Sequence, residues 1–394
     1  MILFEKCGTL VCNYMQDETI HPLTIVGAGP AGLYLSALLS KNSIPHILVD
    51  QAGEISGIGF GILLQDSIFH CLSLLGIDKE DVGVTGTHEL KIFKNDDKEL
   101  DAIHIEDPPV YSARRGALLE ALASKVDQNL LHTKKELSSV EKYRNFSILK
   151  FSDGSIIKTK YVIGADGIKS MVRKSIFIED ATSNVYSAFY FWIKNTGEKM
   201  IKIYPDNGIN VLILPTERDE DVLFITTNKK LTTEGKTNEQ LCREVLSPNT
   251  PFLEHLISQI EFEKPSLLTI VRRTKKFRFA NEASALIGDA AHGETPTLGW
   301  GTTIAIEDAC VLGDQLSKYR DDYPKAFEGY YNLRKKRVAV LHHLTTVQEL
   351  FFGIYSKQEN FLRNILLFFA KPFASYFYNH IRRLYKKLYT YTLS

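Results

Sequence analysis

The chain has 394 residues, in which 47 lysine and arginine side chains balance 47 aspartate and glutamate side chains. A hydrophobic fraction of 44% and a charged fraction of 24% are typical of a folded protein, so intrinsic disorder is excluded as the default. The formal net charge of zero removes any global electrostatic case for binding nucleic acid. At roughly 150 residues per domain, the length predicts two or three domains.

Cysteine usage and hydropathy favour a cytoplasmic protein. The five cysteines are few, odd in number and scattered, which excludes a disulfide framework and a cysteine-based metal site. No stretch reaches the roughly 20 uncharged apolar residues that span a bilayer. Glu5 and Lys6 interrupt the apolar start, so it does not resemble a signal peptide. We expect a reducing compartment, no bound metal and an N-terminal extension over residues 1–20.

A strand–helix–strand unit is the first strong structural pattern in the sequence. Residues 23–26 form a short apolar run with β-branched side chains, typical of a buried strand. Residues 30–39 predict a helix with proline in its first turn, and residues 46–50 predict a second strand. The unit has the size of a parallel βαβ crossover, about 30 residues. Residues 161–164 and 285–288 predict further buried strands, which indicates an α/β, Rossmann-like fold.

A glycine fingerprint joins the first strand to the helix. In its G-x-G-x-x-G pattern Gly27 makes the tight turn, Gly29 admits a pyrophosphate, and Gly32 lets the helix pack closely. The phosphates would lie on the N-terminus of the helix. Asp50 ends the next strand, where its carboxylate can accept hydrogen bonds from ribose hydroxyls. The pattern predicts a dinucleotide site, leaves NAD and FAD open, and has a pure packing role as its alternative.

The residue pattern of the sequence changes between Ser187 and Thr227. Three closely spaced strands are predicted at residues 201–204, 210–214 and 221–225, with turns and no helices between them. They indicate an antiparallel sheet inserted into the first domain. From Tyr323 onward the pattern is helical to the end of the chain.

Two more motifs carry a family resemblance. Gly164-Ala-Asp-Gly167 and Gly288-Asp-Ala-Ala-His292 each close a buried strand, and the second is followed by Pro296 and two glycines. With the glycine fingerprint they stand in the order found in the para-hydroxybenzoate hydroxylase-like family of FAD-dependent aromatic monooxygenases, which the chain resembles over residues 23–337. The resemblance is weakest in the inserted sheet.

The resemblance implies FAD as the cofactor. It assigns FAD contacts to Gly27, Gly29, Ala31, Gly32, Asp50, Arg115, Asp166, Asp289, Pro296, Gly299, Gly301 and Thr302. Asp289 would accept a hydrogen bond from the ribityl chain, with a helix N-cap as its alternative role. We assign no proton-transfer role to His292, and no residue as a catalytic acid or base. No second fingerprint exists in the chain, so NAD(P)H must dock transiently.

The resemblance also implies a discontinuous domain organisation. The FAD-binding domain would comprise residues 21–88, 110–184 and 280–325, the substrate domain residues 89–109 and 185–279, and the C-terminal helical region residues 326–394. The candidate substrate-wall residues are Phe189, Phe191, Trp192, Leu212, Leu214 and Trp300. Side chains alternate along a strand, so only about half of those in the sheet can face the cavity, and the others belong to the core.

The implied activity is oxygen insertion. NAD(P)H would reduce FAD, O2 would form a C4a-hydroperoxide, and an electron-rich aromatic or polycyclic small molecule would be hydroxylated or epoxidised. A flavin-dependent halogenase, a prenyl-chain reductase and a non-catalytic flavin-binding protein are the alternatives. Halogenases carry a W-x-W-x-I-P motif, whereas Trp192 and Trp300 lie far apart in this chain. The substrate, the choice between NADH and NADPH, and the oligomeric state remain open.

The C-terminal segment is basic and amphipathic. No acidic residue follows Glu359, whereas six basic residues alternate with aromatic and aliphatic ones, and Pro372 predicts a break between two helices. We expect these helices to cap the substrate domain. Peripheral contact with an anionic membrane is the second role, with residues 362–373 docked and residues 378–391 on the surface.

Overall fold

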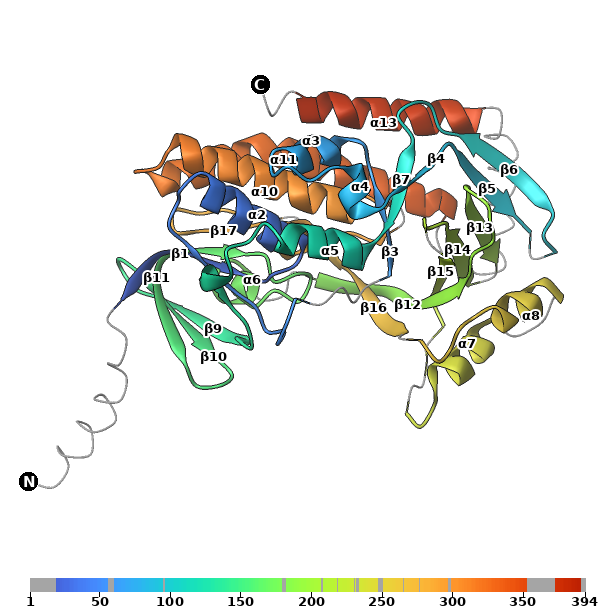
Figure 1. Cartoon of the computed structure of the whole chain (residues 1–394), viewed down its shortest axis with the longest axis horizontal. Helices are drawn as coiled ribbons and strands as arrows, with labels where there is room; N and C mark the ends of the chain where they lie inside the picture. The colour runs from blue at the N-terminus through green and yellow to red at the C-terminus, as the bar shows by residue number, and fades with distance from the viewer. Residues whose placement is uncertain are drawn as a thin grey trace, which may run out of the picture.

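The protein is described by a computed structural model with two large sheets and a cover of helices (Figure 1). The structure describes residues 19–55, 60–94, 96–178, 182–206, 208–217, 219–229, 231, 234–246, 251–264, 266–275, 277–296, 299–352 and 373–390. The predicted extension therefore lies outside the described residues, apart from its last two.

The first sheet contains the predicted βαβ unit. Strand β1 (Ile20–Val26) pairs in parallel with β2 (Ile47–Val49) and with β11 (Ile156–Gly164), and α2 (Pro30–Lys41) makes the crossover. The sheet order is β8-β2-β1-β11-β10-β9, with β17 also paired to β11. The remaining strands of this sheet are β8 (Leu131–His132), β9 (Leu137–Lys142), β10 (Ser147–Phe151) and β17 (Ser284–Leu286). The α/β, Rossmann-like prediction is confirmed.

Helices cover this sheet and build the largest core. Helix α2 is buried along most of its length and packs against α10 (Gly301–Lys318), where Gly313 lies so close to Leu38 that a Cβ atom would come within 2.6 Å of its side chain. Helix α11 (Tyr323–Phe352) packs in turn on α10 (Figure 1). The other short helices are α3 (Ser67–Ser73), α4 (Lys79–Val82), α5 (Arg115–Ala123), η1 (Gln128–Leu130), α6 (Met171–Ile176) and α9 (Asp289–His292).

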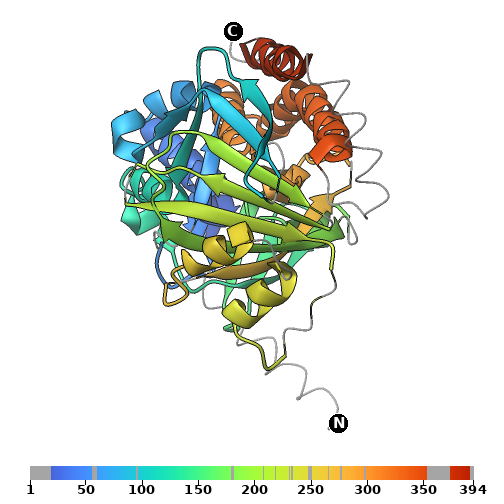
Figure 2. The same cartoon turned by 90° about the vertical axis from the view of Figure 1, so that its right-hand side faces the viewer.

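The second sheet is the inserted one, in the order β16-β12-β15-β14-β13-β5-β6. Its strands are β5 (Glu89–Phe93), β6 (Glu99–His104), β12 (Thr182–Lys194), β13 (Ile201–Asp206), β14 (Ile209–Leu214), β15 (Glu220–Thr227) and β16 (Leu267–Thr274). All neighbours are antiparallel except β13 and β5, which pair in parallel. The β5–β6 hairpin comes from an earlier part of the chain than the other strands of this sheet. Helices α7 (Asn238–Leu246) and α8 (Pro251–Ser258) lie over one face (Figure 2).

A small third sheet stands between the two large ones. It consists of β3 (Gly61–Leu64), β7 (Val110–Arg114) and β4 (Thr85–Thr87), in the order β3-β7-β4. Gly61 lies against the second sheet, since a Cβ atom there would come within 2.9 Å of the Val222 side chain. The strand that precedes α3 thus approaches both the inserted sheet and the helical layer.

Helix α13 (Ala374–Thr390) runs over the edge of the inserted sheet (Figure 1). Asn379 is 3% exposed; its Oδ1 accepts from the Glu106 backbone N–H at 3.0 Å, and its Nδ2 donates to the His104 carbonyl at 2.8 Å. Helix α13 therefore docks against the end of β6, and its Tyr378 and Ile381 side chains also pack against hydrophobic clusters. Pro372 and residues 362–372 lie outside the described residues.

No helix within the described ranges is long and apolar enough to cross a membrane.

Candidate active site

The glycine fingerprint has one open position. Gly27 adopts φ +105°, and a Cβ atom there would lie 2.4 Å from the Ala165 carbonyl oxygen; a Cβ atom on Gly32 would lie 1.8 Å from the Gly27 oxygen. Both glycines are thus required by packing. A Cβ atom on Gly29 would meet no atom of the described chain within 4 Å apart from its chain neighbours, and Gly29 lines a cavity of about 360 Å³. The middle glycine therefore leaves space beside the N-terminus of α2, which has no side-chain cap.

Asp50 braces the same turn. Its Oδ2 accepts from the Ala28 backbone N–H at 2.5 Å, and its Oδ1 accepts from Ala52 at 2.7 Å. Asp50 is not among the described residues that line this cavity. Its carboxylate therefore holds the fingerprint loop and stands beside it.

A cavity of about 360 Å³, called here the main cavity, lies where the three motifs meet the inserted sheet. One wall comes from the motifs and from two helix starts: Gly29, Pro30, Ala31, Arg115, Ala165, Gly167, Gly288, Asp289, Pro296, Gly299, Gly301 and Thr302. The opposite wall comes from the small and inserted sheets: Ile62, Leu63, Tyr190, Leu212, Leu214 and Phe224. Eight of the twelve predicted cofactor contacts therefore lie on one wall of the cavity. Gly27, Gly32, Asp50 and Asp166 are not among the lining residues.

Two charged groups and a phenol meet in the main cavity. Burial raises the pKa of Asp289, while the positive charges of His292, Arg115 and Arg173 oppose that rise. Burial lowers the pKa of Arg115, against the attraction of Asp289. Burial, with the nearby Asp289 charge, raises the pKa of Tyr190. This tyrosine therefore stays a neutral hydrogen-bonding group.

Asp166 lies just behind the cavity wall. Its Oδ2 accepts from the backbone N–H groups of Met171 at 2.7 Å and Val172 at 3.1 Å, so it caps the start of α6. Its Oδ1 is buried and has no hydrogen-bond partner within the described chain. Burial raises the pKa of this carboxyl group. Its neighbours on either side, Ala165 and Gly167, line the cavity.

Arg173 clamps two of the motifs together. This guanidinium is 1% exposed; its Nη1 donates to the carbonyl of Ala290 at 2.7 Å, and its Nη2 donates to the carbonyl of Ile168. The loop after β11 and the short helix α9 thereby keep a fixed spacing. Arg173 follows the Gly164–Gly167 motif in the sequence, but nothing in the pattern indicated this contact.

The inserted sheet presents only part of the predicted substrate wall. Leu212 lies in register with Phe224, which in turn lies in register with Tyr190. The Tyr190 and Phe224 rings are 4.5 Å apart between centroids. Leu212 and Leu214 line the main cavity as expected on alternating positions, whereas Tyr190 and Phe224 were not predicted. Both residues are identified by the strand register, which places Phe224 beside Leu212 and Tyr190 beside Phe224.

The other predicted wall residues are corrected. Phe189 and Phe191 point to the opposite face of β12 and pack in the core beneath α7 and α8, because successive strand side chains alternate. Trp192 stacks on Phe60 at 5.6 Å and under the Arg114 guanidinium, outside the main cavity. Trp300 is 3% exposed and lines a second cavity of about 260 Å³.

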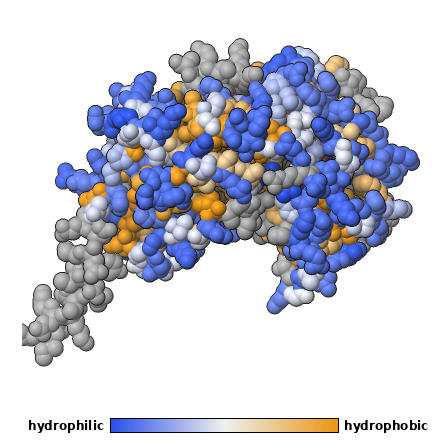
Figure 3. All heavy atoms as spheres, in the orientation of Figure 1, coloured by the Kyte–Doolittle hydropathy of each residue, from blue (hydrophilic) through white to orange (hydrophobic). Residues whose placement is uncertain are grey.

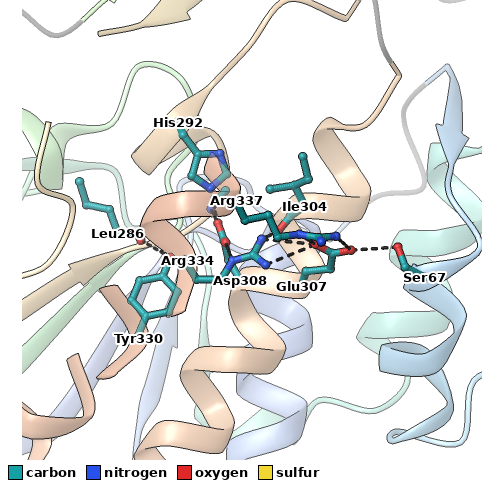
Figure 4. Close-up of polar contacts among 10 residues, drawn as sticks. Ser67, Leu286, His292, Ile304, Glu307, Asp308, Tyr330, Arg334 and Arg337 are labelled. Atoms are coloured by element: carbon teal, nitrogen blue, oxygen red, sulfur yellow. Dashed lines mark hydrogen bonds and ion pairs between the residues drawn. The ribbon is translucent and has the colours of Figure 1, made fainter. Parts of the chain in front are cut away.

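A buried charge network supports the Gly288–His292 motif from behind (Figure 4). The Asp308 Oδ2 atom accepts from the Gly288 backbone N–H at 2.9 Å and contacts His292 Nε2, and Arg334 Nε donates to Asp308 Oδ1 at 2.6 Å. Burial alone would lower the pKa of His292, but the Asp308 carboxylate raises it on balance. Against burial, the His292 and Arg334 charges lower the pKa of Asp308 to about 2.

The network continues to the strand beside the cavity. Glu307 Oε2 accepts from Arg337 Nε at 2.8 Å, and Glu307 Oε1 accepts from Ser67 Oγ at 2.9 Å (Figure 4). Ser67 begins α3, directly after the segment that contains β3. Charged side chains on α10 and α11 therefore tie two cavity-lining segments together.

The fold and this site are those of a dinucleotide-binding flavoprotein with an inserted sheet. The chain belongs to the FAD binding domain family, which matches residues 21–339. It is 26% identical to 3-hydroxybenzoate 6-hydroxylase of Polaromonas naphthalenivorans over 349 residues, 81% of this chain and 84% of that relative. It is 24% identical to FAD-dependent urate hydroxylase of Mycolicibacterium vanbaalenii over 341 residues, 81% of this chain and 85% of the relative.

Solved structures agree in fold. HpxO of Klebsiella pneumoniae, complexed with FAD and uric acid, superposes with a TM-score of 0.77 at 18% sequence identity and covers 96% of this chain and 98% of its own. The para-hydroxybenzoate hydroxylase-like assignment, FAD as the cofactor and the class of FAD-dependent NAD(P)H monooxygenase are confirmed. The chain is an oxidoreductase that uses O2 and a small-molecule substrate.

Proposed function

We propose that this monooxygenase oxygenates an electron-rich aromatic or polycyclic molecule held in the main cavity between the cofactor-binding wall and the inserted sheet. The observation that carries the proposal is the composition of the two walls. One wall consists of motif loops and helix starts, and the other presents Tyr190, Phe224 and Leu212 side by side. Such a cleft, mostly apolar with few polar groups, suits a small aromatic ligand.

The described residues fit FAD. Gly29 leaves an open cradle beside the uncapped start of α2, and the Asp166 Oδ1 atom is an orphaned buried acceptor next to the cavity. In the proposal Gly29 and α2 hold the pyrophosphate, while Arg115 and Asp289 hold the middle of the cofactor. When bound, FAD supplies the redox chemistry that passes one oxygen atom from O2 to the substrate.

The chain's own contribution is orientation and electrostatics. Helix α10 begins at Gly301 without a side-chain cap, so its first backbone N–H groups and its dipole face the cavity wall and favour negative charge there. Tyr190, Leu212 and Phe224 exclude water from the opposite wall. The proposal assigns cofactor binding to residues 21–88, 110–184 and 280–325, and substrate binding to residues 89–109 and 185–279, with residues 326–394 as a helical cover. NAD(P)H docks transiently from solvent.

A turnover screen tests this function. Purified yellow protein is mixed with NADH or NADPH, and oxidation of the nicotinamide is followed with and without a panel of phenols and fused-ring aromatics. We expect at least one aromatic compound to accelerate oxidation and to gain one oxygen atom. Acceleration coupled instead to chlorine incorporation or to alkene reduction would favour the halogenase or the prenyl-chain reductase.

We propose cytosolic residence with peripheral membrane contact through α13. The outward side of this helix carries Tyr376 and Leu384, which are 64% and 46% exposed, and Phe373 before it is 66% exposed. Arg383 is exposed beside them, although its guanidinium approaches Glu106. Hydrophilic side chains prevail over α13 in the space-filling view (Figure 3). Aromatic and basic groups on one helix face suit an anionic lipid surface, and each basic group there contributes about 1 kcal/mol.

Vesicle co-sedimentation tests this membrane contact. We expect the protein to sediment with anionic vesicles at low salt and to be released as salt rises. Tyr376→Ser combined with Leu384→Ser should abolish binding, because these residues supply the exposed apolar contacts. Leu100→Ser, at an exposed apolar position on β6, is the matched control and should bind normally. Equal binding by the double variant would contradict the proposal.

A further inference from the structure

Few charged side chains line the main cavity. Among the described lining residues, the charged ones are Arg115, Asp289 and Glu294. The wall from the inserted sheet is apolar except for the hydroxyl group of Tyr190. The balance of the lining is therefore one guanidinium against two carboxyl groups.

The Glu294 side chain is held at the cavity by two basic partners. Its side chain is 7% exposed, its Oε2 accepts from Arg273 Nε at 3.0 Å, and its Oε1 contacts His342 Nδ1. Arg273 belongs to β16 and His342 to α11, so two different elements hold the carboxylate at the cavity. The nearest basic groups are thereby engaged with Glu294, and this anion can still accept a hydrogen bond from a ligand in the cavity.

The remaining lining cation lies near a carboxyl group, whose negative charge favours the charged form of the guanidinium. Arg115 lies on the cofactor wall and interacts with Asp289. A substrate carboxylate would lose its hydration, approach Glu294 and Asp289, and find no cation of its own among the described lining residues. Burying an uncompensated charge in this way is costly. A neutral phenol avoids that cost, because its ring contacts Phe224 and Leu212 while its hydroxyl group donates to Glu294 or pairs with Tyr190.

We propose that the main cavity takes uncharged hydroxyl-bearing aromatic substrates, and that Glu294 is the specificity residue that rejects carboxylated ones. The proposal rests on the function proposed above and names its substrate class. The proposal also distinguishes this chain from any relative whose substrate is a benzoate, because in this chain the carboxyl group at the cavity belongs to the protein and not to the substrate.

Equilibrium binding to the FAD-loaded protein tests the selectivity without turnover. The probes are 2-naphthol and 2-naphthoate at neutral pH, which share the ring system and differ in charge. Binding is followed by calorimetry and by the change in flavin absorbance. We expect 2-naphthol to bind at least about tenfold more tightly than 2-naphthoate, which is the factor that one modest unpaired-charge cost of about 1.4 kcal/mol produces.

Two variants make the test specific. Glu294→Gln should weaken 2-naphthol binding and narrow the preference several-fold, because it removes the anion but keeps a polar side chain. Leu212→Arg leaves the Glu294 contacts intact and places a cation on the half-buried Leu212 position, so it should reverse the preference. Leu100→Arg, an exposed position outside the lining, should leave both affinities unchanged.

The possible outcomes distinguish a failure of this inference from a failure of the proposed function. Equal or tighter binding of 2-naphthoate by the wild type overturns the inference, and so does an unchanged preference in Leu212→Arg. Failure of both probes to bind a protein that retains FAD also overturns it, because the cavity then does not accept neutral fused-ring phenols. Protein that carries no FAD after purification would instead contradict the proposed function itself.

Discussion

Gly29→Val is expected to give a folded protein that has lost its FAD. A Cβ atom at this position meets no atom of the described chain within 4 Å apart from its chain neighbours, and the backbone φ of −74° suits any residue, so folding is preserved. The same atom and its two methyl groups would fill the space that a pyrophosphate needs beside the start of α2. The measurement is flavin absorbance of the purified variant, with circular dichroism to check the fold. The expected result is a colourless protein with a wild-type spectrum.

Substitutions at two other glycines provide comparisons for Gly29→Val. Gly53→Val is the matched control, since a Cβ atom there would be in ordinary contact with Lys134 at 3.4 Å, and that variant should stay yellow. Gly32→Ala should fail for a different reason, because its Cβ atom would come within 1.8 Å of the Gly27 carbonyl oxygen and block helix packing. A folded Gly29→Val protein with normal flavin absorbance would refute the cofactor assignment.

Arg334→Met should cause the largest loss of stability. Arg334 is 0% exposed and donates to Asp308 at 2.6 Å, and its guanidinium also reaches Glu307 at 3.4 Å. Removing one partner of a buried ion pair leaves uncompensated charge, which typically costs about 3–5 kcal/mol. Urea unfolding of the FAD-loaded protein gives the change in the free energy of unfolding.

Two further variants separate the effect of burial on stability from the effect of charge. Arg278→Met removes a cation whose partner Glu328 is 51% exposed, as Arg278 itself is, so it should cost less than about 1 kcal/mol. Combining Arg334→Met with Asp308→Asn should recover part of the loss, since the second change removes the unpaired anion. Equal effects of Arg278→Met and Arg334→Met would show that the network in Figure 4 does not support the motif.

Local patterns predicted the parts of the fold that the chain builds from neighbouring residues. The βαβ unit follows from short apolar strands, a proline at the helix start and the glycine turn, and the structure confirms it. The alternation rule likewise implied that only half of the aromatic run could face the cavity. The rule could not decide which half of these side chains faces the cavity. That choice depends on which face of the sheet α7 and α8 cover.

Long-range contacts explain what the sequence did not reveal. Tyr190 and Phe224 reach the cavity through the register of β12, β15 and β14, which depends on pairings between distant segments. The engagement of Glu294 with β16 and α11 has the same origin. Helix α13 docks in part through Asn379 and Arg382, which donate hydrogen bonds to the backbone carbonyls of His104 and Glu106 that no periodicity encodes.

The most direct test of the account is turnover under ¹⁸O2 with a neutral phenol that binds the FAD-loaded protein. The product is analysed by mass spectrometry while NAD(P)H oxidation is recorded in parallel. The account predicts a product that carries one ¹⁸O atom on the aromatic ring, formed only when NAD(P)H is present. A product without ¹⁸O, from a protein that holds FAD and oxidises NAD(P)H in response to the phenol, would contradict it.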